Sequence, residues 1–205
     1  MTWLNRLGFM APTPAPAPVH DDSTLLARLA AGDAEALALL YRRESGSIYR
    51  YALALAGDEA AALDAVQEAF AQLLRGPQAF DAGRGSLGAY LAGMARHQVL
   101  SQWRDARRHV PLDDTLDTPL DATGSPHIAP GSDAPLHQAQ QRQGLWAAIR
   151  TLSWPQREAL TLVDLQERSY GEAAAIAGIS VDVLRTRLHR ARQRLADLLA
   201  VGERP

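Results

Sequence analysis

Residues 170–195 read YGEAAAIAGISVDVLRTRLHRARQRL. The pattern predicts a short helix ending at Ala177, a turn at Gly178 and a second helix that Ser180 caps, because glycine tolerates positive φ and a serine oxygen accepts from free amides. The second helix carries arginines with no acid between them: Arg185, Arg187, Arg190, Arg192 and Arg194. A helix-turn-helix with a basic second helix suits the major groove of DNA, so DNA binding is the first hypothesis.

The composition limits the classes of function that remain. The chain has 205 residues, 47% of them hydrophobic, and no cysteine, which excludes disulfides, thiolate metal sites and cysteine nucleophiles. No apolar run approaches the roughly 20 residues of a membrane span, and residues 1–10 lack the apolar core of a secretory signal. We therefore expect a cytoplasmic protein without membrane insertion. The net charge of −2 does not oppose DNA binding, because local patches set the attraction to phosphate.

The chain divides into four segments by composition. Residues 1–22 form a disordered leader rich in proline and alanine, which favour an extended spacer. Residues 23–108 and 136–200 carry helical patterns, and the acidic residues 109–135 between them lack periodicity, as in a flexible linker. The predicted fold class is all-α: two small helical domains on a flexible linker, the second a helix-turn-helix domain of winged-helix-like DNA-binding type.

Polar residues that follow glycine or begin an apolar pattern predict the helix starts. We expect caps at Ser23, Asp33, Asp58 and Ser86, and a break between helices at Ser153. The buried faces follow from the spacing of apolar residues. The residues expected to be buried are Leu63, Val66, Phe70 and Leu73; Leu87, Leu91, Ala95, Val99 and Trp103; and Leu184, Leu188, Leu195 and Leu198.

Four stretches in order resemble one known family. They are LLARL, GDAEAL and LYRR between residues 25 and 43; DAVQEAF at 64–70; FD, GRGS, AYL and AR between 80 and 96; and LSWPQRE at 152–158 with RLHRAR at 187–192. The chain resembles the extracytoplasmic-function (ECF) sigma factors of bacterial RNA polymerase, which retain only the second and fourth conserved regions. The resemblance extends from Thr24 to Leu199 except for the linker. It implies region 2 in residues 23–108 and region 4 in residues 136–200.

Asp64, Gln67 and Glu68 lie on one face of a predicted helix, because residues three and four apart are neighbours. From spacing alone, this is a solvated polar face. The resemblance implies instead that the face binds the coiled coil of the polymerase β′ subunit, where its charges would set association rate and specificity.

The resemblance also implies that the last helix of the first domain, with the loop before it, binds the minus-ten element as single-stranded DNA. The candidate residues are Arg84, Tyr90, Arg96, His97, Arg104, Arg107 and Arg108. Bases freed during promoter opening are held by stacking and pocket capture. The alternative is that Tyr90 belongs to the core and that the terminal arginines favour a helix C-terminus. Gly88, Gly93 and His97 depart from the family's usual residues, as does Tyr90, where tryptophan is common.

The arginine-rich helix is implied to read the minus-thirty-five element. The candidates are Val181, Asp182, Arg185, Arg187, His189, Arg190 and Arg192. Arg185 lies near the N-terminus of the helix, where base edges are reached, whereas Arg187, Arg190 and Arg192 suit phosphates. A solvated basic face is the alternative.

No catalytic constellation, paired metal spacing or glycine-rich phosphate loop occurs in the sequence, so we expect no enzyme activity, cofactor, metal or small-molecule substrate. The resemblance implies a sigma factor that binds core RNA polymerase, directs it to promoter DNA and opens the duplex, with an anti-sigma factor as a further partner. Two alternatives remain: a conventional helix-turn-helix repressor or activator, and an interaction protein whose arginine helix binds an acidic partner.

Overall fold

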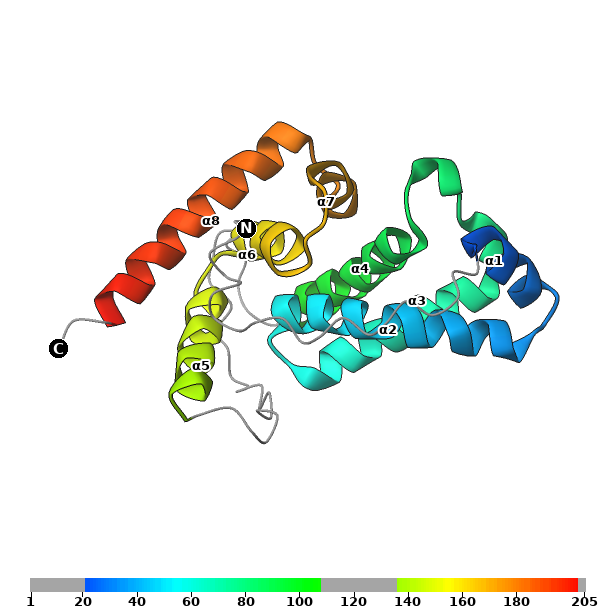
Figure 1. The fold of residues 1–205 in the computed structure, drawn as a ribbon, viewed down its shortest axis with the longest axis horizontal. Coiled ribbons are helices and arrows are strands. Elements are labelled where there is room, and N and C mark those ends of the chain that lie inside the picture. Colours follow the sequence, from blue (N-terminus) through cyan, green and yellow to red (C-terminus); the bar gives the residue numbers. More distant parts are fainter. Residues whose placement is uncertain (1–20, 108–135, 203–205) are drawn as a thin grey trace. The chain divides into compact units, whose positions relative to one another are not determined.

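The computed structural model describes residues 21–107 and 136–202, which form helices without strands (Figure 1). The chain divides into two compact units. We name residues 21–107 the N-terminal unit and residues 136–202 the C-terminal unit. The leader and the linker that the sequence predicts lie outside the described residues, apart from Asp21 and Asp22. The helices are α1 Asp22–Ala30, α2 Ala34–Ala56, α3 Glu59–Arg75, α4 Leu87–Arg107, α5 Leu136–Arg150, α6 Trp154–Leu160, α7 Tyr170–Ala177 and α8 Val181–Gly202, with short 3₁₀ turns at Pro77–Ala79 and Ala82–Arg84 and a π-helical turn at Thr161–Leu165.

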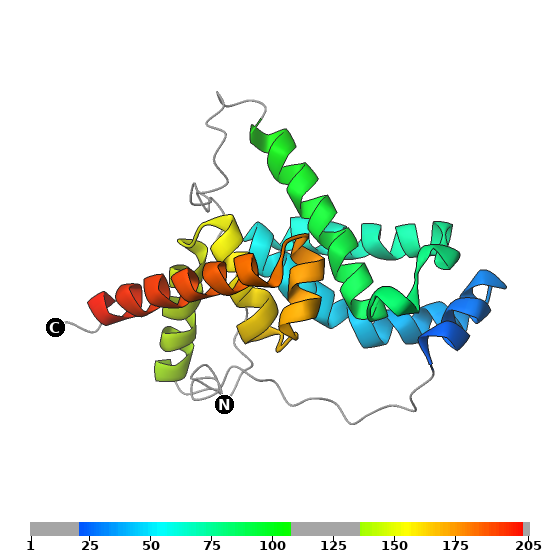
Figure 2. The same cartoon turned by 90° about the horizontal axis from the view of Figure 1, so that it is seen from above.

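In the N-terminal unit, α2, α3 and α4 pack against one another, and α4 crosses the other two at an angle (Figure 2). The predicted turns separate these helices. Gly32 and Gly57 have φ of 85° and 71°, a conformation that glycine adopts without steric cost. The next residues, Asp33 and Asp58, accept hydrogen bonds from the backbone N–H groups of Glu35 and Ala61. These caps confirm the predicted starts of α2 and α3.

The predicted core of this unit is largely confirmed. Val66, Phe70 and Leu73 of α3 are buried, as are Leu87, Leu91, Ala95 and Val99 of α4, while Trp103 is half-buried. The prediction for Leu63 is wrong, because its side chain is 50% exposed. The buried arc of α3 is centred on Ala62, Ala69 and Leu73, and Leu63 lies about 100° from that centre, at the edge of the arc.

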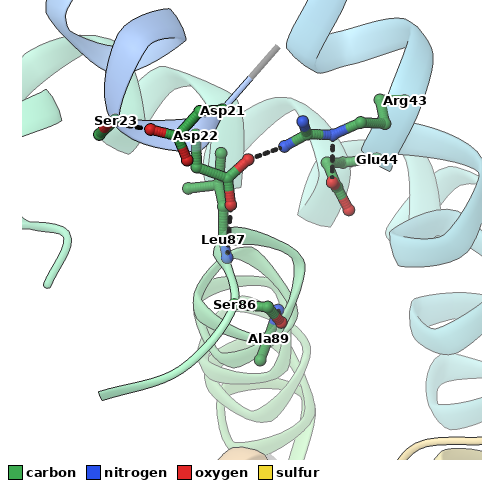
Figure 3. Close-up of polar contacts among 8 residues, drawn as sticks. All are labelled: Asp21, Asp22, Ser23, Arg43, Glu44, Ser86, Leu87 and Ala89. Atoms are coloured by element: carbon green, nitrogen blue, oxygen red, sulfur yellow. Dashed lines mark hydrogen bonds and ion pairs between the residues drawn. The ribbon is translucent and has the colours of Figure 1, made fainter. Parts of the chain in front are cut away.

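Asp22 joins three helices at one end of the N-terminal unit (Figure 3). Its carboxylate pairs with Arg43 of α2 and accepts a hydrogen bond from the backbone N–H of Leu87, the first residue of α4, at 3.4 Å. Ser86 accepts from the N–H of Ala89 at 3.2 Å, which confirms it as the cap of α4. Ser23 does not cap α1: its hydroxyl donates to Asp21, the N-cap residue, because the helix already begins at Asp22.

In the C-terminal unit, α8 packs across α5 and α6 (Figures 1 and 2). The break at Ser153 is confirmed, with Pro155 in the first turn of α6. Gly178 has φ of 67°, and Ser180 accepts from the N–H of Val183 at 3.4 Å, so the predicted helix-turn-helix is present. Along α8, Leu184, Leu188 and Leu195 are buried and Leu198 is half-buried.

The predicted helix-turn-helix is present in residues 136–202, but the wing of a winged-helix domain is not. A wing is made of β-strands, and residues 136–202 contain none. Among the described residues, no helix is long and apolar enough to cross a bilayer.

Candidate protein and nucleic-acid interfaces

The structure places Asp64, Gln67 and Glu68 together on α3, on the side away from its buried arc. Asp64 and Gln67 are exposed, and Glu68 is half-buried. Glu68 accepts hydrogen bonds from the Gln72 amide at 3.0 Å and the Arg75 guanidinium at 2.6 Å. The Gln72 bond and then the Arg75 bond hold the pKa of Glu68 below its usual range. Glu68 is therefore ionised and oriented at neutral pH, and Asp64 adds a second negative charge one turn away.

An open groove between α2 and α3 adjoins this acidic face, and the sequence analysis did not predict it. Tyr41 and Leu74 are exposed at its walls, and the Tyr41 ring lies 4.9 Å from that of Phe70 between centroids. The groove is lined mostly by apolar side chains, together with two polar ones: Ala34, Leu37, Ala38, Tyr41, Arg42, Gln67, Phe70, Ala71 and Leu74. Because Gln67 belongs to both, the acidic face and the groove form one continuous surface. Leu74 was the available signal in the sequence, because its spacing places an apolar side chain off the buried face of α3.

The loop before α4 presents Arg84 to solvent at the end of a 3₁₀ turn. The Tyr90 ring packs against Phe80, with centroids 5.6 Å apart and planes tilted by 57°. Both rings are half-buried. Tyr90 thus packs against the fold and is also partly accessible to a base. Both alternatives for Tyr90, a core residue and a base contact, therefore stay open.

Three of the predicted residues of α4 share one face of the helix. Tyr90, His97 and Arg104 are spaced seven residues apart, which keeps them aligned over about 21 Å. His97 and Arg104 are exposed. Arg96 is half-buried and lies off this line, whereas the Arg107 side chain and Arg108 lie outside the described residues. The structure therefore brings together part of the predicted minus-ten set.

The predicted minus-thirty-five residues are distributed along the outer surface of α8. Asp182, Arg185, His189 and Arg190 are exposed, while Val181 and Arg187 are half-buried. Arg185 lies 3.4 Å from the Asp182 carboxylate, and its guanidinium carbon is 5.6 Å from the centroid of the Tyr170 ring. The side chain at the position best suited to base reading is thus held by two neighbours.

Arg192 has a second role in the structure. Its guanidinium donates to both carboxylate oxygens of Asp164, at 2.9 and 2.5 Å, and the Asp164 side chain is 1% exposed. This bond raises the pKa of Arg192. Asp164 lies in the π-helical turn that follows α6, so the ion pair attaches α8 to the helix beneath it. Contact between Arg192 and a DNA phosphate stays a prediction. The guanidinium that would make this contact already has a bidentate partner in Asp164.

Two protein-family models match the chain. Sigma-70 region 2 matches residues 40–109, and Sigma-70, region 4 matches residues 142–195. The ECF RNA polymerase sigma factor EcfG of Rhodopseudomonas palustris is 35% identical over 159 residues, which cover 76% of this chain and 80% of that protein. The chain belongs to the ECF sigma factor family.

Other relatives agree. This sigma factor is 31% identical to BldN of Streptomyces coelicolor over 175 residues, or 85% of its own length, but it spans only 64% of the length of BldN. A solved structure of RpoE from Bartonella quintana, in complex with the anti-sigma factor NepR, is 27% identical, with a TM-score of 0.60 over 81% of this chain and 97% of that one. The N-terminal unit is therefore a region 2 domain and the C-terminal unit a region 4 domain.

The matches leave the individual site residues as predictions. The structure shows two further residues in contact with them that the sequence analysis missed. Tyr170 and Asp164 contact predicted arginines of α8 from outside that helix. Their contacts join residues 15 to 28 positions apart, which no local pattern encodes. Among the described residues, no three histidine, cysteine, aspartate or glutamate side chains are grouped so as to hold a metal ion.

Gly93, one of the residues that depart from the family, provides a test of α4. A Cβ added at Gly93 would meet open space, so Gly93→Ala is expected to raise the free energy of unfolding of this unit by about 1 kcal/mol. Gly85→Ala is the control, because the φ of 148° at Gly85 makes a side chain unfavourable there and predicts a loss. Denaturant unfolding measures both; a destabilised Gly93→Ala would show that the glycine is required by the fold.

Proposed function

We propose that this sigma factor binds core RNA polymerase through the acidic face and groove of its N-terminal unit and reads the minus-thirty-five element through α8. The observation that carries the proposal is the order of the two matched regions, the first with an exposed acidic helix face and the second with an arginine-rich recognition helix. A conventional regulator needs no region 2 domain, so that alternative is not favoured.

In this proposal, α4 and the loop before it open the promoter. Arg84, His97 and Arg104 would follow the phosphates of the non-template strand, and the Phe80–Tyr90 pair would offer an aromatic surface to an unstacked base. Stacking on aromatic rings compensates for part of the base pairing lost on opening. The chemistry of RNA synthesis remains that of the polymerase, and this chain acts as a non-catalytic initiation subunit.

The domain limits complete the proposal. Residues 23–108 serve as the region 2 domain and residues 136–200 as the region 4 domain, and residues 109–135 give the tether between two separated promoter elements. The limits are supported by the last helix of the first unit, which ends at Arg107, and the first helix of the second, which begins at Leu136. Because RNA polymerase acts in the cytoplasm, the protein is proposed to work there.

Run-off transcription tests the function directly. Purified core polymerase is incubated with fragmented genomic DNA, with and without the full chain, and the expected result is a set of discrete transcripts that depend on this protein. Binding to the same fragments is then measured over a range of salt concentrations. The logarithm of the binding constant is expected to fall with the logarithm of the salt concentration, with a slope of roughly 0.9 for each neutralised phosphate. DNA binding without transcripts would favour a conventional regulator. Loss of both would favour an acidic protein partner.

An anti-sigma factor is the further proposed partner. The RpoE relative was solved in complex with one, and the surfaces proposed here for polymerase and DNA are exposed in the isolated chain. A partner that covers either surface would prevent initiation. A pull-down with the tagged full chain, before and after stress, is expected to recover such a protein only before induction; recovery of polymerase alone in both states would contradict this.

A further inference from the structure

Arg185, the predicted base reader, is restrained before any DNA is bound. Its guanidinium lies over the Tyr170 ring at 5.6 Å and pairs with Asp182 at 3.4 Å. Asp182 precedes it on the same helix, whereas Tyr170 is the first residue of α7 and reaches α8 from the other helix of the helix-turn-helix. The aromatic contact therefore links the orientation of Arg185 to the packing of the two helices.

The Tyr170 side chain is itself next to a fixed part of the fold. Tyr170 comes from α7, and Arg192 lies seven residues after Arg185 on the same helix, so it shares a face of α8 with Arg185. Arg192 is forked onto the buried Asp164 carboxylate. Asp164 thus fixes α8 on the helix beneath it through Arg192, and Tyr170 contacts exposed Arg185 on the α8 helix that is fixed in this way.

The advantage of this arrangement is pre-organisation. A free arginine on a helix surface loses its rotamer freedom when it forms two hydrogen bonds to a base edge, and that loss weakens binding. A cation over an aromatic face is already limited to a few rotamers. The Arg185 side chain is 62% exposed, so its guanidinium is still accessible from solvent.

We propose that Tyr170 is a positioning residue for sequence reading, which holds the Arg185 guanidinium at the DNA-facing side of α8. The proposal rests on the proposed function of α8. It differs from a phosphate contact in one respect: Tyr170 acts on base preference rather than on general DNA affinity.

The test uses holoenzyme reconstituted from core polymerase and the full chain. The probes are a promoter duplex found by run-off transcription, its single-base variants in the upstream element, and a random duplex of equal length. Tyr170→Leu is expected to reduce the preference by about fivefold at the same base pair that Arg185→Ala affects, with binding to the random duplex unchanged. Tyr170→Phe, which keeps the ring, is expected to retain the preference within about twofold.

The double variant separates positioning from an independent contact. If Tyr170 acts through Arg185, adding Tyr170→Leu to Arg185→Ala causes no further loss of preference. Additive losses, or an equal fall on the promoter and random duplexes, would overturn the proposal. If Arg185→Ala loses base preference and Tyr170→Leu does not, the proposal fails while the proposed function stands. If the wild type has no upstream base preference, the proposed function of α8 fails as well.

Discussion

Arg157→Met is expected to lower the stability of the C-terminal unit by about 3 kcal/mol, which corresponds to a fall of more than about 10 °C in its melting temperature. Arg157 is 1% exposed, and its guanidinium donates to the backbone carbonyls of Arg150 and Leu152, at 2.7 and 2.9 Å. These carbonyls end α5 and the turn after it. Without the guanidinium, the buried Leu152 carbonyl and the part-buried Arg150 carbonyl would both lose that donor. Burial, with a smaller contribution from Arg150, lowers the pKa of Arg157 to about 10, so the group is still charged at neutral pH.

Thermal unfolding of the full chain measures this effect. Tryptophan fluorescence is a suitable signal, because Trp154 is buried in the same unit. Arg194→Met is the matched control: it removes the same charge from an exposed position of α8 and is expected to change stability by less than about 0.5 kcal/mol. Equal melting of the two variants would mean that Arg157 does not hold the end of α5.

Asp64→Arg combined with Glu68→Arg is expected to weaken binding to core polymerase by at least about 100-fold, because the variant places two positive charges where the proposed partner surface is basic. Asp64 is fully available to a partner, whereas Glu68 is shared with Gln72 and Arg75 and must keep or exchange those bonds on binding. Fluorescence titration of labelled full chain with core polymerase measures the dissociation constant.

Glu59→Arg controls for the charge change. Glu59 is exposed on the same helix, but its side chain leaves the helix axis in about the opposite direction from that of Glu68. Its reversal is expected to leave polymerase binding within about threefold, with helical content unchanged in both variants. A similar loss from Glu59→Arg would indicate a general effect of charge, and undiminished binding of the double variant would remove this face from the proposed interface.

Local signals in the sequence predicted most helix boundaries. Asp33, Asp58, Ser86 and Ser180 were expected to cap helices and do so, because a cap bond joins residues two or three positions apart. Ser23 was the exception, since α1 begins one residue earlier than expected and Asp21 occupies the N-cap position. The helical class also follows from periodicity, and the resemblance of the four motifs to the ECF family implied the two regions; neither depends on distant contacts.

The sequence alone could not assign the arginines. It predicted a row of them on α8 and contained one more, Arg157, in the LSWPQRE stretch at residues 152–158. The tertiary structure decided that Arg157 is buried against carbonyls, that Arg192 is paired with Asp164, and that Arg185 stays exposed over an aromatic ring. Caps and helical faces are set by residues within one or two turns, and can therefore be predicted from short stretches of sequence. The partner of a long side chain is set by the packing of whole helices, and α6, α7 and α8 must come together before any arginine acquires one.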